Sequence, residues 1–108
     1  MKKFLVLYRS PVSAQEQMSK ATPEQAKAGM DAWMQWAGKA GHAIVDMGAP
    51  TQSVAHLNGG ALAGHIGGYG VVQAETADAA KALFDGHPHL MMPGASIEIL
   101  ELLAMPGM

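Results

Sequence analysis

The segment His87-Pro88-His89 holds two imidazoles close together in the sequence. The proline fixes the backbone between them and can aim both rings, which suits an acid–base pair or a metal site. A tight metal site needs three or four ligands, and only the fold can bring His65 or Asp46 close enough to supply a third. We therefore expect no bound metal and no other cofactor. Two interpretations stay open: a polar pocket with His87 as a catalytic and His89 as a ligand-binding residue, or two solvated loop histidines.

Asp46 interrupts the otherwise apolar stretch 43–47. A carboxylate buried there would need a partner or a raised pKa, and a raised pKa is what suits a carboxylate to act as a general base. The alternative is a side chain on the solvent side of an irregular edge strand. Glu98 poses a similar question. Strand alternation places it on the face opposite Ile97 and Ile99, and that face either lines a dimer interface or is exposed to water.

Three further side chains are candidates for contact with a ligand. Arg9 ends the first apolar run, where its guanidinium could anchor an anionic ligand, although such an arginine more often completes an ion pair. Trp33 and Tyr69, together with Trp36, could line a pocket for a planar organic molecule. The alternative for these aromatic side chains is core filling.

The composition excludes several classes of function. With 108 residues the chain predicts a single domain with its own core. A formal charge of −2 gives no basic surface for nucleic acid or anionic lipid, and zero cysteines exclude disulfides and thiolate chemistry. The apolar run after Lys2-Lys3 stops at Arg9, too short for a signal peptide, and no run approaches a membrane span. We expect a cytoplasmic protein that binds neither nucleic acid nor membrane.

Hydrophobic patterning and turn residues place the elements that must position these side chains. A strand is expected at 3–9, buried on both faces, and Thr22-Pro23-Glu24-Gln25 is a strong helix start. That helix should run to Ala40 and bury the stripe Ala26, Met30, Trp33, Ala37 and Ala40. The remaining elements are a second strand at 43–48 and 51–57 broken at Pro50, a long glycine-rich hairpin loop from 58 to 68, a strand at 69–75, a helix at 77–85 and a strand at 95–103.

The element order β, α, β, β, α, β predicts an α+β protein with the ferredoxin-like fold. Right-handed crossovers place both helices on one face of a four-stranded antiparallel sheet. The first strand, however, is apolar on both faces, so the face away from the helices would be an exposed apolar patch too large for a monomer. We therefore expect a homodimer in which a second subunit covers that face.

Short sequence pieces in a characteristic order carry a resemblance to a known family. They are Ala40-Gly41, Gly48-Ala49-Pro50, Gly67-Gly68-Tyr69, Gln73-Ala74-Glu75-Thr76, Ala79-Ala80-Lys81-Ala82-Leu83 and Gly86-His87-Pro88-His89. Through these pieces nearly the whole chain resembles the YCII-related domain family of the dimeric α+β barrel superfamily. The resemblance implies two sheets packed face to face in a dimer, with a cavity between sheet and helices in each subunit.

The resemblance does not select one reaction. The superfamily includes cofactor-free monooxygenases, muconolactone-isomerase-like enzymes and haem enzymes, and a His/Asp pair has been proposed as catalytic in some YCII-related proteins. The helix 23–40 holds no histidine to match that pair. Our first hypothesis is a small-molecule enzyme with proton-transfer or isomerase-like chemistry on an apolar or aromatic substrate, using Asp46, His87 and Arg9. The alternative is a non-catalytic ligand-binding or accessory dimer.

Overall fold

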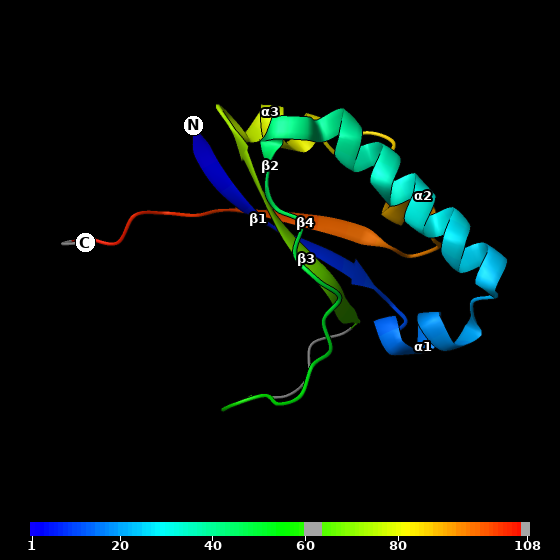
Figure 1. The fold of residues 1–108 in the computed structure, drawn as a ribbon. Helices are drawn as coiled ribbons and strands as arrows, with labels where there is room; N and C mark the ends of the chain where they lie inside the picture. Colours follow the sequence, from blue (N-terminus) through cyan, green and yellow to red (C-terminus); the bar gives the residue numbers. More distant parts are fainter. Residues whose placement is uncertain (60–63, 107–108) are drawn as a thin grey trace.

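The computed structural model describes residues 1–59 and 64–106 and has an α+β architecture with one antiparallel sheet (Figure 1). The strand order in the sheet is β2-β3-β1-β4. In chain order the elements are β1 (Lys2–Ser10), α1 (Ala14–Lys20), α2 (Pro23–Ala40), η1 (Gly41–Ala43), β2 (Ile44–Asp46), β3 (His65–Ala74), α3 (Ala77–Ala82), η2 (Pro88–Met91) and β4 (Ser96–Glu101), where η marks a 3-10 helix. The predicted α+β class and the four-stranded antiparallel sheet are confirmed.

The long helix α2 begins where the sequence predicts. The Thr22 side chain accepts a hydrogen bond from the backbone N–H of Gln25, and the Gln25 side chain accepts one from the backbone N–H of Thr22. This capping box satisfies two backbone donors that the first helical turn leaves free, and Pro23 fits the first helical position. α2 then lies diagonally across one side of the sheet (Figure 1).

The core lies between the sheet and the helices α2 and α3. On the central strand β1, alternate residues Phe4, Val6 and Tyr8 are buried, as the period of two in a strand requires. They pack with Trp36 of α2 and with other buried residues from β3, α3 and the loop after α3, namely Val72, Ala74, Ala80 and Phe84. α2, α3 and the loop after α3 thus all pack on the same face of β1.

The other face of the sheet is covered by neither α2 nor α3. Its central residues are Leu5 and Leu7, each with register partners on both sides. Leu5 lies between Val71 and Leu100, and Leu7 lies between Tyr69 and Glu98. We refer to this surface, made of Leu5, Leu7, Arg9, Tyr69, Val71, Glu98 and Leu100, as the uncovered face.

The predicted second strand is too long. β2 ends at Asp46, and residues 51–57 form no strand, because Pro50 cannot donate a ladder hydrogen bond and only an isolated bridge joins it to Gly68. The segment still runs beside β3 as far as Thr51, whose N–H donates to the carbonyl of Gly67. Gly48 permits this approach, because it has a φ of +72° and a Cβ there would lie 1.8 Å from the Tyr69 carbonyl oxygen.

The predicted glycine-rich hairpin loop is also wrong in its last part. β3 begins at His65, so Gly67 and Gly68 lie inside a strand, next to the irregular segment that follows β2. A bulge between Tyr8 and Arg9 accommodates Gly67, and glycine in a strand often marks such a bulge or a close backbone approach. Residues 60–63 of the predicted loop lie outside the described residues.

The helices and the last strand differ in extent from the prediction. α3 ends at Ala82 rather than at 85, and β4 is shorter at both ends than the predicted 95–103. The apolar stripe of α2 packs against the core only in its C-terminal half, where Trp33, Ala37 and Ala40 are partly buried, whereas Ala26 and Met30 are exposed. In the described ranges, no helix is both long enough and apolar enough to cross a membrane.

Candidate functional site

His87 lies at the centre of a cluster of aromatic rings and is fully buried. The ring centroids of Trp33 and Trp36, both on α2, lie 4.5 and 4.6 Å from the centroid of His87 in edge-on arrangements. Tyr8 of β1 stacks on the imidazole with a centroid distance of 5.3 Å, and Phe84 lies at 5.7 Å. We call these five side chains the His87 cage. The sheet, the long helix and the loop after α3 all contribute to it.

The hydrogen bonds of His87 define which of its ring nitrogens carries the proton. Nδ1 accepts a hydrogen bond of 3.0 Å from the backbone N–H of His89, so that His87 caps the 3-10 helix η2. An accepting Nδ1 is unprotonated, and the proton of the neutral ring is therefore on Nε2. Nε2 is buried and has no hydrogen-bond partner among the described residues.

Burial keeps both polar rings of the cage uncharged. It lowers the pKa of His87 to about 4, with a smaller contribution in the same direction from the charge of nearby His89. Burial also raises the pKa of Tyr8 to about 12. At neutral pH the cage therefore holds a neutral imidazole and a neutral phenol, and His87 acts as a hydrogen-bond donor through Nε2 rather than as a charged acid.

His89 has a different environment from His87. Its Nε2 lies 2.9 Å from the carbonyl oxygen of Arg9 and 3.1 Å from that of Ser96. Carbonyl oxygens only accept, so this nitrogen carries a proton and donates to both. His89 thereby ties η2 to the ends of β1 and β4, which stabilises the loop that carries His87. Its predicted role in ligand binding stays a prediction.

A small cavity of about 10 Å³ lies beside the cage, with room for roughly one water molecule. Three cage residues line it, and so do residues of β2 and β3: Tyr8, Trp33, Trp36, Ile44, Asp46, Met47, Gly70, Val71 and Val72. Asp46 thus lines the same small cavity as Tyr8, Trp33 and Trp36, the three rings that also contact His87. Its side chain is exposed, and Oδ1 accepts a hydrogen bond of 2.8 Å from the backbone N–H of Gly48.

Two predicted site residues lie on the opposite side of the sheet. The guanidinium of Arg9 forms an ion pair of 3.2 Å with Glu98 across neighbouring strands of the uncovered face. Tyr69 lies on the same face, in register with Leu7. The fold thus brings Asp46, Trp33 and His87 to one region and leaves the side chains of Arg9 and Tyr69 in another.

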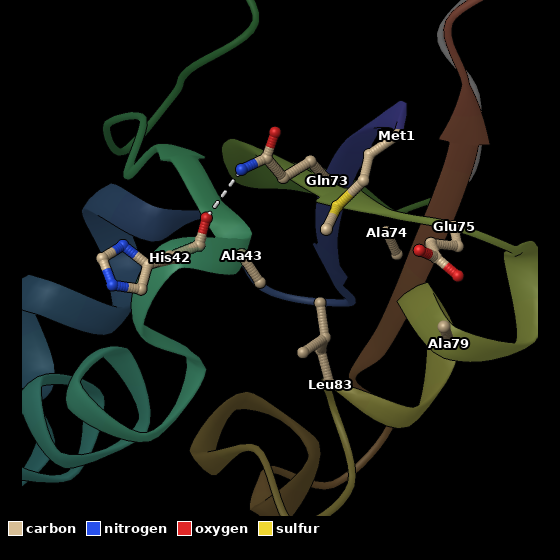
Figure 2. A pocket seen from close by; sticks show the side chains of 8 residues that line it. All are labelled: Met1, His42, Ala43, Gln73, Ala74, Glu75, Ala79 and Leu83. Carbon is tan, nitrogen blue, oxygen red and sulfur yellow. Dashed lines mark hydrogen bonds between the residues drawn. The ribbon is translucent and has the colours of Figure 1, made fainter.

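The larger cavity, of about 310 Å³, lies at another end of the sheet and contains none of the predicted site residues (Figure 2). Its walls are mainly small and apolar: Met1, Ala43, Ala74, Ala79 and Leu83. The Gln73 side chain donates to the carbonyl of His42 at 2.9 Å, and the imidazole of His42 points away from the cavity (Figure 2). The polar residues that line this cavity are the exposed His42 and Glu75 and the half-buried Gln73, whose side chain is already hydrogen-bonded, so we place the candidate site at the His87 cage.

Sequence reasoning missed two members of the cage. Tyr8 belongs to the strand predicted at 3–9 and Phe84 to the helix predicted at 77–85, and neither was named as a candidate site residue. For His87 itself the sequence held a signal: proline is common at the first position of a helix, so Pro88 marks His87 as the residue that caps η2. Within residues 1–59 and 64–106 no group of three His, Asp or Glu side chains is arranged to hold a metal ion.

Comparison of the sequence with models of known protein families found no match, and comparison with curated proteins found no significant match. The relation to YCII-related proteins therefore remains a prediction from the sequence pieces quoted above.

Proposed function

We propose that this chain is the subunit of a homodimeric, YCII-related enzyme that transfers a proton on a small planar substrate bound at the His87 cage. The observation that carries the proposal is the fully buried imidazole of His87, whose Nε2–H has no partner among the described residues. Buried polar groups are nearly always hydrogen-bonded, so each exception requires an explanation, and a catalytic or binding role is one of them. A carboxylate, Asp46, lines the cavity on the other side of the same rings.

The two groups have complementary chemistry. The exposed carboxylate of Asp46 can accept a proton from a carbon next to a carbonyl group. The Nε2–H of neutral His87 can donate to the oxygen on which negative charge then develops. A neutral imidazole used as such a donor is an established device in isomerases. This division of roles is the proton-transfer chemistry that the sequence suggests.

We further propose that the fold is ferredoxin-like and that two copies associate through the uncovered face. The strand order β2-β3-β1-β4, with α2 and α3 packed on one side, supports the first statement. Support for the second comes from the apolar centre of the uncovered face, where Leu5, Leu7 and Leu100 lie in adjacent register positions. A sheet face of this kind is usually covered by another layer of structure.

Exchange of carbon-bound protons tests the enzyme proposal directly. The protein is incubated with 1-indanone in heavy water, and loss of the proton signals next to the carbonyl is followed by NMR. We expect exchange above the buffer rate, and a loss of about 10²–10⁴-fold in the variant Asp46→Asn. Asp31→Asn, an exposed carboxylate of α2, is the matched control and should exchange at the wild-type rate. Exchange at the buffer rate with wild-type protein would contradict catalysis on this substrate.

A non-catalytic ligand-binding dimer is the second candidate. It is favoured by one observation, the hydrogen bond that already occupies Oδ1 of Asp46 and fixes the carboxylate in its own turn. Under this alternative 1-indanone binds without proton exchange, and Asp46→Asn leaves its affinity unchanged.

A further inference from the structure

The unpartnered nitrogen of His87 restricts the chemistry of any ligand that reaches it. Nδ1 is already occupied by the backbone N–H of His89, so Nε2 carries the proton and can only donate. A ligand atom that pairs with Nε2–H must therefore be an acceptor. An ammonium group offers only donors, so its N–H groups would face the N–H of His87 without forming a hydrogen bond. A protonated amine therefore cannot pair with Nε2–H of this tautomer.

The arrangement of rings restricts the ligand's shape. Trp33 and Trp36 present themselves edge-on to His87, whereas Tyr8 stacks on it at an angle of 29° between planes. A flat ring inserted between these side chains can form offset-stacked and edge-to-face contacts, while a bulky saturated group would have to separate them.

One wall of the cage can move more easily than the others. The indole of Trp36 is buried and donates a hydrogen bond of 2.8 Å to the carbonyl of Leu83, and Tyr8 is buried on the central strand β1. Trp33 is only half-buried, and its indole makes no hydrogen bond within the described part of the chain. It also lines the small cavity, next to the partly exposed Met47. Rotation of Trp33 is therefore the simplest way to join the cavity to His87.

We propose that the His87 cage binds a planar molecule with a carbonyl or enolate oxygen, which enters by displacing Trp33 and accepts a hydrogen bond from Nε2–H of His87. This inference deepens the proposed function and rests on it for the location of the site. It adds the preference for an uncharged acceptor over a cation and the side chain that admits the ligand.

Three probes on one carbon skeleton test the ligand class: 1-indanone as acceptor, 1-aminoindane as cation and indane without a polar group. Binding is measured by the ¹⁵N–¹H NMR signals of His87 Nε2–H and the tryptophan indoles. We expect 1-indanone to move the His87 signal downfield and to bind at least tenfold more tightly than either other probe. Trp33→Phe should speed association by opening the entrance, with the preference for the ketone unchanged.

The variant His87→Phe keeps a flat ring and removes the donor, so it should bind 1-indanone and indane equally. If this variant does not fold, the His87 signal of the wild-type protein decides the question alone. Equal or tighter binding of 1-aminoindane, or binding of 1-indanone without movement of the His87 signal, would overturn the inference. The inference would also be overturned if none of the three probes binds. Proton exchange that depends on Asp46 but occurs without a shift of the His87 signal would overturn the inference and leave the proposed function standing.

Discussion

The backbone N–H of His89 donates a hydrogen bond to Nδ1 of His87 at 3.0 Å, and this contact assigns opposite tasks to two neighbouring histidines. His87 is held neutral, with its remaining N–H enclosed among aromatic rings. The Nε2–H of His89 donates to the carbonyl oxygens of Arg9 and Ser96 and fixes the loop in place. Pro88 between them sits at the first position of η2, where its lack of an N–H costs nothing.

The neutral state of His87 predicts that stability falls in mild acid. An unfolded histidine has a pKa of about 6.5, whereas burial lowers that of folded His87 to about 4. Between these values the unfolded chain binds a proton that the folded chain does not, so the free energy of unfolding decreases as the pH falls from about 6.5 to about 4. At 1.36 kcal/mol per pH unit the full loss is about 3 kcal/mol. Urea unfolding across this range measures it.

A variant without the titrating ring isolates the contribution of His87 from that of all other groups. His87→Phe should lose most of the pH dependence between 5 and 6.5, because no proton binds there in either state. The exposed His56 provides the matched control, and His56→Gln should keep the wild-type slope. An unchanged slope in His87→Phe would show that another group is responsible.

Local signals in the sequence predicted the elements whose causes are local. The capping box at Thr22 fixed the start of α2, and the apolar run 3–9 identified the central strand. The second strand was predicted too long because its pairing depends on a contact that no local pattern shows, the approach of Gly48 to the backbone of Tyr69. The glycines of β3 were assigned to a loop for the same reason, since their role in a strand depends on the neighbouring segment.

The candidate site was predictable only in part. Asp46, Trp33 and His87 were recognised from their residue types, and the fold brings all three to the same region. Arg9 and Tyr69 were grouped with them because the sequence alone does not show which face of each strand the helices cover. The burial of His87 could not be predicted, because it results from α2, β1 and the loop after α3 meeting in space.

Two glycine substitutions are predicted to act in opposite directions. Gly48→Ala places a Cβ in van der Waals conflict with the Tyr69 carbonyl at a positive φ, and should destabilise the fold by about 2 kcal/mol or more. Gly38→Ala lies in an exposed part of α2 with nothing within 4 Å, and should stabilise the fold by about 0.5–1 kcal/mol. Thermal unfolding compares the two variants. A neutral Gly48→Ala would mean that the segment after β2 does not lie against β3.

The uncovered face predicts dimerisation that a single charge should disrupt. Leu7 lies at its centre, between Tyr69 and Glu98 in register. In a dimer that buries this face, Leu7→Lys would bury an ammonium group, and we expect monomers at micromolar concentration in sedimentation velocity. Met18→Lys changes an exposed side chain of α1 and should leave the dimer intact. A wild-type protein that sediments as a monomer would refute the proposed assembly.

Asp46 is predicted to matter for the reaction and little for the fold. Its Oδ1 accepts the hydrogen bond from the N–H of Gly48, and the amide oxygen of asparagine can accept the same bond. Asp46→Asn should therefore unfold within about 0.5 kcal/mol of wild type, and Asp46→Ala, which loses the acceptor, should be about 1 kcal/mol less stable. Urea unfolding measures both differences.

The comparison of these two variants separates a catalytic from a structural carboxylate. If Asp46 accepts the substrate proton, both variants lose exchange of 1-indanone protons to a similar degree, although only the alanine variant loses stability. If the carboxylate only fixes its turn, activity follows stability, and the asparagine variant keeps full exchange. Asparagine and wild-type proteins with the same exchange rate and the same affinity for 1-indanone would leave Asp46 without a role in the reaction. If neither protein exchanges the ketone protons above the buffer rate but both bind 1-indanone, the donor of His87 serves binding alone, as in the non-catalytic alternative.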